Sequence, residues 1–99
     1  MARIPVNRQK IARFCRRNHI RRLAFFGSVL REDFRAGSDV DVVVEFEPGA
    51  SVGYIRLASM EGELSELLGR KVDLNTPGLL GRHFRDAVLR EAEVQYVSA

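Results

Sequence analysis

The chain has 99 residues, 45% of them hydrophobic and 29% charged, and its formal net charge is +3 at pH 7. This length fits one compact domain over residues 1–99, without a linker, that buries about 65% of the surface its unfolded chain exposes. No segment approaches the roughly 20 apolar residues of a membrane span, and the first ten residues lack the apolar core of a signal peptide. The single cysteine, Cys15, excludes an intrachain disulfide. We therefore expect a cytoplasmic protein.

The first predicted element is a helix that begins after an N-cap at Asn7 and runs to about Asn18. Its inward face carries Ile11, Phe14 and Cys15. Basic side chains gather in this first quarter of the chain, at Arg13, Arg16, Arg17, Arg21 and Arg22. Such a cluster attracts phosphate, RNA or an acidic protein. No aromatic residues for base stacking interleave with it, so nucleic acid stays an open but less favoured partner.

A short buried strand over residues 23–26 follows, and a turn at Gly27 and Ser28 ends it. Gly27 lets backbone amides approach a phosphate closely, and the Ser28 hydroxyl adds a donor at the start of a short helical turn. We therefore expect Gly27 and Ser28 to bind nucleotide phosphate. A cap on the short helix is the simpler role for Ser28, and both roles can coexist.

The next predicted strand carries two carboxylates at its start. Its apolar face consists of Val40, Val42, Val44 and Phe46, and its other face consists of Asp39, Asp41, Val43 and Glu45. Asp39 and Asp41 point to the same side, where two hard oxygen ligands can share divalent cations. Without a cation, the same pair could cap the following loop or meet nearby arginines.

Apolar residues at helical spacing follow the second strand and predict a helix that ends at a glycine cap, Gly69. These residues are Leu57, Met60, Leu64, Leu67 and Leu68. A third strand over residues 71–75 then places Asp73 on the face opposite Val72 and Leu74, so Asp73 is a candidate third carboxylate. The alternative for Asp73 is an ordinary surface position on a short strand.

The last predicted helix begins at Thr76 and Pro77, because threonine is a common N-cap and proline is common at the first helical position. Its expected apolar face consists of Leu80, Phe84, Ala87 and Val88. Residues 94–97 add a short edge strand. Together the elements predict an α/β (α+β) fold in which helices flank a small mixed β-sheet.

The ordered motifs resemble the minimal nucleotidyltransferases of the DNA polymerase beta-like superfamily. That pattern is a Gly-Ser turn, an Arg soon after it, Ser-Asp-x-Asp opening a strand, and a later Val-Asp-Leu. Here these elements are Gly27-Ser28, Arg31, Ser38-Asp39-Val40-Asp41 and Val72-Asp73-Leu74. The combination is specific, whereas Gly-Ser or Asp-x-Asp alone would be weak. The resemblance implies a nucleotidyltransferase fold.

Transfer of a nucleotidyl group requires that the triphosphate is anchored and that the negative charge developing on it is neutralised. Asp39, Asp41 and Asp73 are the expected catalytic residues and the expected ligands of two Mg²⁺ ions, with ATP as substrate. Gly27 and Ser28 are the expected nucleotide-binding residues. Arg31 stays outside the catalytic set, since it can contact phosphate or pair with an acid such as Asp33 or Asp41.

Many relatives have Gly-Ser-x-Ala-Arg-Gly, whereas this chain has bulkier Leu30 and acidic Glu32 near the phosphate turn. The resemblance further implies an antitoxin that transfers AMP from ATP to a tyrosine of a HEPN-family RNase toxin, its partner in a hetero-oligomer. One alternative is an antitoxin that neutralises its toxin by binding alone. Another is nucleotidyl transfer to a small molecule or an RNA 3′ end. The sequence names no base-reading residue and no acceptor residue.

Overall fold

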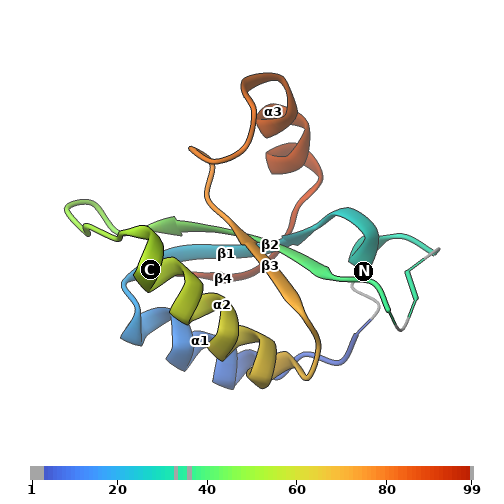
Figure 1. The fold of residues 1–99 in the computed structure, drawn as a ribbon, viewed down its shortest axis with the longest axis horizontal. Coiled ribbons are helices and arrows are strands. Elements are labelled where there is room, and N and C mark those ends of the chain that lie inside the picture. Colours follow the sequence, from blue (N-terminus) through green and yellow to red (C-terminus); the bar gives the residue numbers. More distant parts are fainter. Residues whose placement is uncertain (1–3, 33, 36, 99) are drawn as a thin grey trace.

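A four-stranded mixed sheet organises the computed structural model, which describes residues 4–32, 34–35 and 37–98. The elements are α1 (Arg8–Arg17), β1 (Ile20–Phe26), the 3₁₀ helix η1 (Gly27–Leu30), β2 (Val40–Phe46), α2 (Tyr54–Leu68), β3 (Val72–Asn75), α3 (Arg82–Glu91) and β4 (Glu93–Val97). The strand order is β3-β2-β1-β4, with β2 and β3 parallel and the other neighbours antiparallel (Figure 1). This confirms the predicted α+β class with helices on a small mixed sheet.

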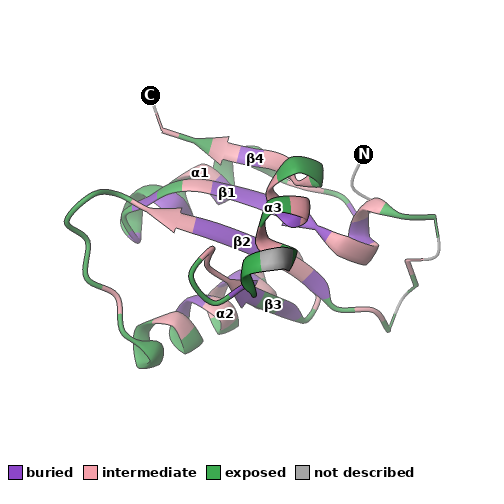
Figure 2. Cartoon of the chain, turned by 90° about the horizontal axis from the view of Figure 1, so that it is seen from above, coloured by how far each residue is buried: buried purple, intermediate pink, exposed green. Residues whose placement is uncertain are grey.

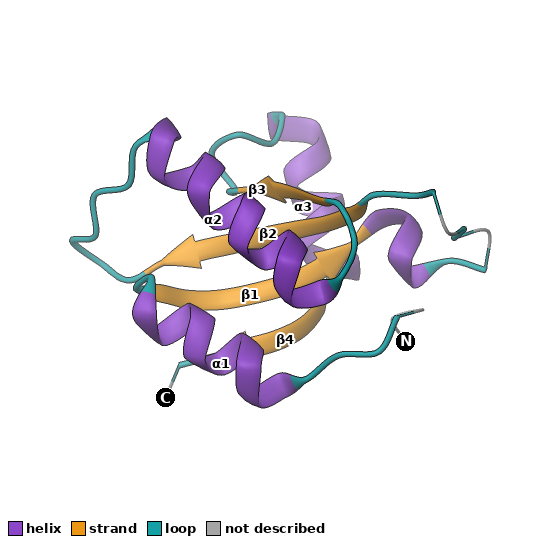
Figure 3. Cartoon of the chain, turned by 60° about the horizontal axis from the view of Figure 1, so that its bottom comes forward, coloured by secondary structure: helices purple, strands orange, loops and turns teal. Residues whose placement is uncertain are grey.

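The helices divide between the two faces of the sheet. Helices α1 and α2 lie together on one face (Figure 3), and α3 lies on the other. The larger core is on the first face and includes Ile11, Phe14, Val42, Val44 and Leu64. The smaller core under α3 consists of Ala24, Phe26, Val43, Leu80 and Val88. Seen from above, the buried positions of β1 and β2 run beneath α3 (Figure 2). Because side chains alternate along β2, Asp41 shares the α3 face with Val43.

The first helix begins where its capping residue predicts. The Asn7 side-chain oxygen accepts a hydrogen bond from the Lys10 backbone N–H at 3.1 Å. The helix ends at Arg17 with Asn18 as its C-cap. Helix α2 likewise ends at Gly69, whose φ of 69° lies in the left-handed region that favours glycine. Both predicted helix ends are confirmed.

Removal of the Asn7 cap should lower stability by a small amount. Asn7→Ala leaves an N–H of the first turn without its side-chain partner, so we expect a loss of about 1 kcal/mol. For a domain of this size, that corresponds to a fall of about 4–8 °C in Tm. Thermal unfolding followed by circular dichroism measures it, with Asn7→Ser, which restores an acceptor, as control. An unchanged Tm in Asn7→Ala would mean that the cap adds nothing.

Strand β1 begins earlier than the prediction of residues 23–26. Its first residue is Ile20, which pairs with Phe46 of β2. Arg21 and Arg22 interrupt the apolar pattern there, but both reach Glu45 across the sheet, with Arg21 Nη2 at 3.1 Å from Glu45 Oε1. Cross-strand ion pairs thus let charged residues extend the strand.

Helix α3 begins later than predicted, at Arg82 instead of directly after Thr76 and Pro77. The Leu79 N–H donates to the Thr76 carbonyl at 3.0 Å, so the proline enters a turn. Leu80 is buried but precedes the helix, and Phe84 is 58% exposed instead of packed. The prediction was wrong for Leu80, which lies outside the helix, whereas Phe84 shares the apolar face with Ala87 and Val88 without being buried. β4 confirms the predicted edge strand, and no helix in the described ranges is long and apolar enough to cross a membrane.

Candidate active site

The strand register brings two of the predicted carboxylates side by side. Asp41 of β2 and Asp73 of β3 are partners in the parallel ladder. Paired residues of neighbouring strands project to the same face of a sheet, so both carboxylates lie on the face covered by α3. On the other side of β2, Phe26 is the partner of Asp41, and Gly27 directly follows Phe26. The candidate site therefore spans the ends of three neighbouring strands.

Gly27 lies directly against the Asp41 carboxylate. Its φ is +73°, in the left-handed region, and a Cβ added there would stand 2.5 Å from Asp41 Oδ2. Both observations require glycine at this position. The sequence predicted Gly27 as a phosphate contact, and the structure adds that its missing side chain makes room for Asp41. Ser28 follows in η1, half-buried, and its carbonyl accepts a hydrogen bond from the Arg31 N–H at 2.9 Å.

Burial and neighbouring carboxylates raise the pKa of Asp41. Partial burial is the largest cause, Asp73 and Asp39 add repulsion between like charges, and the nearby Arg31 guanidinium opposes the increase in pKa. Asp41 is half-buried, whereas Asp39 and Asp73 are exposed. The three predicted carboxylates therefore form one electrostatic group, with Asp41 as its most enclosed member.

This group fits a divalent cation in its chemistry. Carboxylate oxygens are the donors that Mg²⁺ prefers, and a cation would relieve the repulsion that raises the Asp41 pKa. Across residues 4–32, 34–35 and 37–98, however, no three metal-ligating side chains already stand close enough to form a cluster. Asp41 and Asp73 lie on adjoining strands, and Asp39 directly precedes the first residue of β2.

A pocket of about 220 Å³ opens beside Asp41. Its sheet side is lined by Phe26, Gly27, Arg31 and Asp41, and its α3 side by Phe84, Ala87, Val88 and Glu91. Sequence reasoning missed Phe84 and Glu91 as pocket residues. The available signal was their spacing, because residues 84, 87, 88 and 91 form one helical stripe. Asp33, considered above as a partner for Arg31, lies outside the described residues.

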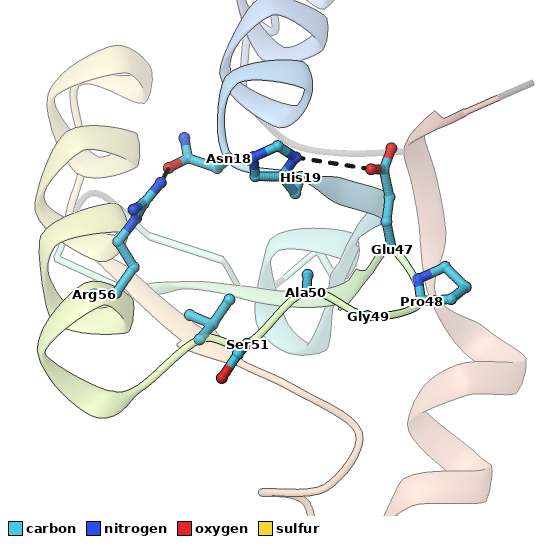
Figure 4. A pocket seen from close by; sticks show the side chains of 9 residues that line it. Asn18, His19, Glu47, Pro48, Gly49, Ala50, Ser51 and Arg56 are labelled. Atoms are coloured by element: carbon cyan, nitrogen blue, oxygen red, sulfur yellow. Dashed lines mark hydrogen bonds and ion pairs between the residues drawn. The ribbon is translucent and has the colours of Figure 1, made fainter.

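A second pocket, of about 430 Å³, lies at the opposite ends of β1 and β2 (Figure 4). It is lined by Asn18, His19, residues 47–52 and Arg56. The polar side chains there already contact one another, since His19 Nδ1 lies 3.8 Å from Glu47 Oε2 and Arg56 donates to the Asn18 side chain at 3.2 Å. This pocket contains none of the predicted site residues, so the smaller pocket at Asp41 is the candidate active site.

Residues 8–95 match the family model described as nucleotidyltransferase domain. The chain belongs to this nucleotidyltransferase family. A Methanocaldococcus jannaschii protein, provisionally named a protein adenylyltransferase, is 33% identical over 85 residues, which are 86% of this chain and 89% of that protein. The protein adenylyltransferase MntA of Thermococcus cleftensis is 36% identical over 72 residues, 73% of this chain and 71% of MntA.

Several solved structures share the fold. A protein provisionally described as a minimal nucleotidyltransferase is 36% identical and superposes with a TM-score of 0.71, covering 86% of this chain and 85% of that one. A toxin-antitoxin structure with AMP-PNP gives a TM-score of 0.76 at 20% identity, covering 94% and 75%. A complex of a tri-AMPylated Shewanella oneidensis HEPN toxin with its MNT antitoxin gives 0.68 at 19% identity, covering 92% and 70%. The sequence-based prediction of a nucleotidyltransferase enzyme is confirmed.

Proposed function

We propose that this nucleotidyltransferase is a Mg²⁺-dependent antitoxin that transfers AMP from ATP to a tyrosine hydroxyl of a HEPN RNase toxin. The observation that carries the proposal is the placement of Asp41 between Gly27 and Asp73 at the mouth of a pocket. Relatives named as protein adenylyltransferases, and fold neighbours that are HEPN toxin-antitoxin complexes, support the choice of reaction and partner.

In this proposal Asp39, Asp41 and Asp73 hold the magnesium, with two ions expected. When bound, Mg²⁺ would supply positive charge to the reacting phosphate and to the departing pyrophosphate. Gly27 offers its backbone to the triphosphate without a side chain in the way, and Ser28 adds a hydroxyl donor beside it. Arg31 lines the same pocket and adds a cation near the phosphate path.

The transfer itself is a displacement at phosphorus. The tyrosine oxygen forms a bond to the α-phosphorus of ATP, the bond from that phosphorus to the pyrophosphate oxygen breaks, and pyrophosphate leaves. The hydroxyl proton passes to Asp73, which is exposed at the edge of the sheet and therefore accessible to an incoming partner. The exposure of Asp73 supports an acceptor side chain that comes from another protein.

Co-expression with a HEPN partner tests this proposal. The purified complex is incubated with Mg²⁺ and α-labelled ATP, and intact-mass analysis counts AMP groups on the partner. We expect an AMP-sized increment with wild type and none with Asp39→Ala plus Asp41→Ala, while the complex still forms. Toxin silenced equally by wild type and double variant, with no increment, would favour neutralisation by binding alone.

The position of the basic residues of α1 argues against an RNA end as the acceptor. Arg8, Arg13 and Arg16 line a shallow groove of about 450 Å³ on that helix. Helix α1 covers the face of the sheet opposite α3, whereas Asp41 and Asp73 lie on the α3 face (Figure 1). The 3′ end of an RNA bound along α1 would therefore lie on the face of the sheet opposite the carboxylates. Labelling of RNA instead of protein in the same assay would reverse this conclusion.

A further inference from the structure

Phe84 is an exposed aromatic side chain at the candidate active site. It is 58% exposed, although it begins the helical stripe whose next members, Ala87 and Val88, turn toward the sheet. Val88 is buried in the small core with Phe26 and Val43. The stripe thus continues beyond the packed core, and its first residue lines the pocket that also contains Gly27 and Asp41. Other large apolar side chains, such as Ile55 and Val97, are at least as exposed, so the feature that sets Phe84 apart is its place in this pocket.

The two sides of this pocket differ in chemistry. The sheet side presents Gly27, the Arg31 guanidinium and the Asp41 carboxylate, which suit phosphate and its cation, beside the buried ring of Phe26. The α3 side presents the phenyl ring and the aliphatic Ala87 and Val88, with the Glu91 carboxylate two helical turns from Phe84. A nucleotide has the same division, with a charged phosphate end and a flat aromatic base. At about 220 Å³ the pocket is smaller than the roughly 300 Å³ at which whole-ligand pockets begin, so it suits part of a nucleotide.

We propose that Phe84 stacks on the base of the bound nucleoside triphosphate and positions it while the phosphates reach Gly27 and Asp41. This inference rests on the proposed function for the presence of a triphosphate. Stacking on a phenyl ring uses the face of the base, which every base possesses, so Phe84 provides affinity without choosing among bases. Phe84 is thus a positioning residue for the substrate and takes no part in proton transfer.

Binding measurements without any acceptor protein test the stacking. Calorimetry with AMP-PNP and Mg²⁺ should show about tenfold weaker binding for Phe84→Ala than for wild type, as expected for loss of one stacked base. Inorganic tripolyphosphate, which has no base, should bind both proteins equally. Tyr54→Ala is the matched control, because Tyr54 is also an exposed aromatic, at 78%, and lies on α2 outside this pocket. It should bind both ligands as wild type does.

A fluorescence experiment gives an independent signal, because the chain contains no tryptophan. Phe84→Trp places a single indole at the pocket, and its fluorescence should be quenched by AMP-PNP and by GTP but not by tripolyphosphate. Tyr54→Trp should respond to none of them.

Three results would overturn the inference alone. Equal weakening of AMP-PNP and tripolyphosphate in Phe84→Ala would assign Phe84 a role in the shape of the phosphate site. Unchanged nucleotide binding with a raised KM for the toxin would mean that the ring contacts the acceptor. Tripolyphosphate binding without any AMP-PNP binding by wild type would exclude a base site while leaving phosphate recognition intact. If wild type bound neither ligand, the proposed function would fail together with this inference.

Discussion

Replacement of Asp41 by asparagine should lower nucleotidyl transfer by about 1,000-fold, which corresponds to about 4 kcal/mol of lost transition-state stabilisation. Asp41 is the half-buried member of the carboxylate group and lies between Gly27 and Asp73. Asparagine keeps the shape but removes the negative charge, so the site loses its central anionic ligand for the expected cation. The transfer rate at saturating ATP measures the effect. Asp86→Asn, an exposed α3 aspartate outside the pocket, should retain full activity.

The same substitution should raise the stability of the metal-free protein. Burial and the neighbouring carboxylates raise the pKa of Asp41, so its ionised form disfavours the folded state. This penalty is present at pH values above the raised pKa and disappears as the pH falls toward the ordinary value of 3.8. In EDTA at pH 7 we therefore expect a higher Tm for Asp41→Asn than for wild type, with the difference shrinking in acid. A lower Tm for the variant at pH 7 would contradict the assigned repulsion.

Gly27→Ala should impair both activity and folding. The left-handed φ of +73° costs an L-residue about 1–2 kcal/mol, and the new Cβ would stand 2.5 Å from Asp41 Oδ2. Because Asp41 must move to admit the methyl group, we expect transfer to fall by about 100-fold, the usual effect of a displacement of about 1 Å at a reacting centre. Steady-state kinetics and thermal unfolding measure the two effects.

Gly69→Ala is the matched control for Gly27→Ala. Gly69 has nearly the same φ, +69°, but a Cβ there would meet nothing within 4 Å. Both variants should therefore lose similar backbone stability, and only Gly27→Ala should lose activity. A similar fall in activity for both would trace the effect to general destabilisation.

Local pattern was enough to predict the strands that carry the site. Alternation over residues 40–46 placed Asp39 and Asp41 opposite the valine face, and Val72 and Leu74 did the same for Asp73. These patterns repeat every two residues and depend only on which face is buried. The roles of Asp39, Asp41, Asp73, Gly27 and Ser28 in catalysis, metal binding and nucleotide binding stay predictions.

The rest depends on contacts between distant segments. The pairing of Asp41 with Asp73 is set by the register of a parallel crossover, which the sequence of either strand does not specify. The contact of Gly27 with Asp41 depends on the same sheet geometry. Phe84 illustrates a different limit, because its helical spacing marks the correct face of α3 but not whether other residues cover that position. Exposure of Phe84 is therefore a tertiary property.

Because Cys15 is buried, the reactivity of its thiol reports how often the fold opens around it. This lone thiol is fully enclosed between α1 and the sheet, and burial raises its pKa to about 12 despite the opposing effect of Arg16. A thiol reagent can therefore react only when α1 separates from the sheet or the whole chain unfolds. Asp41 and Asp73 lie on the other face of the sheet, the face against which α3 packs. Nucleotide that stabilises the whole domain should therefore slow alkylation of Cys15. Nucleotide that stabilises only the α3 side of the sheet should leave the alkylation rate unchanged.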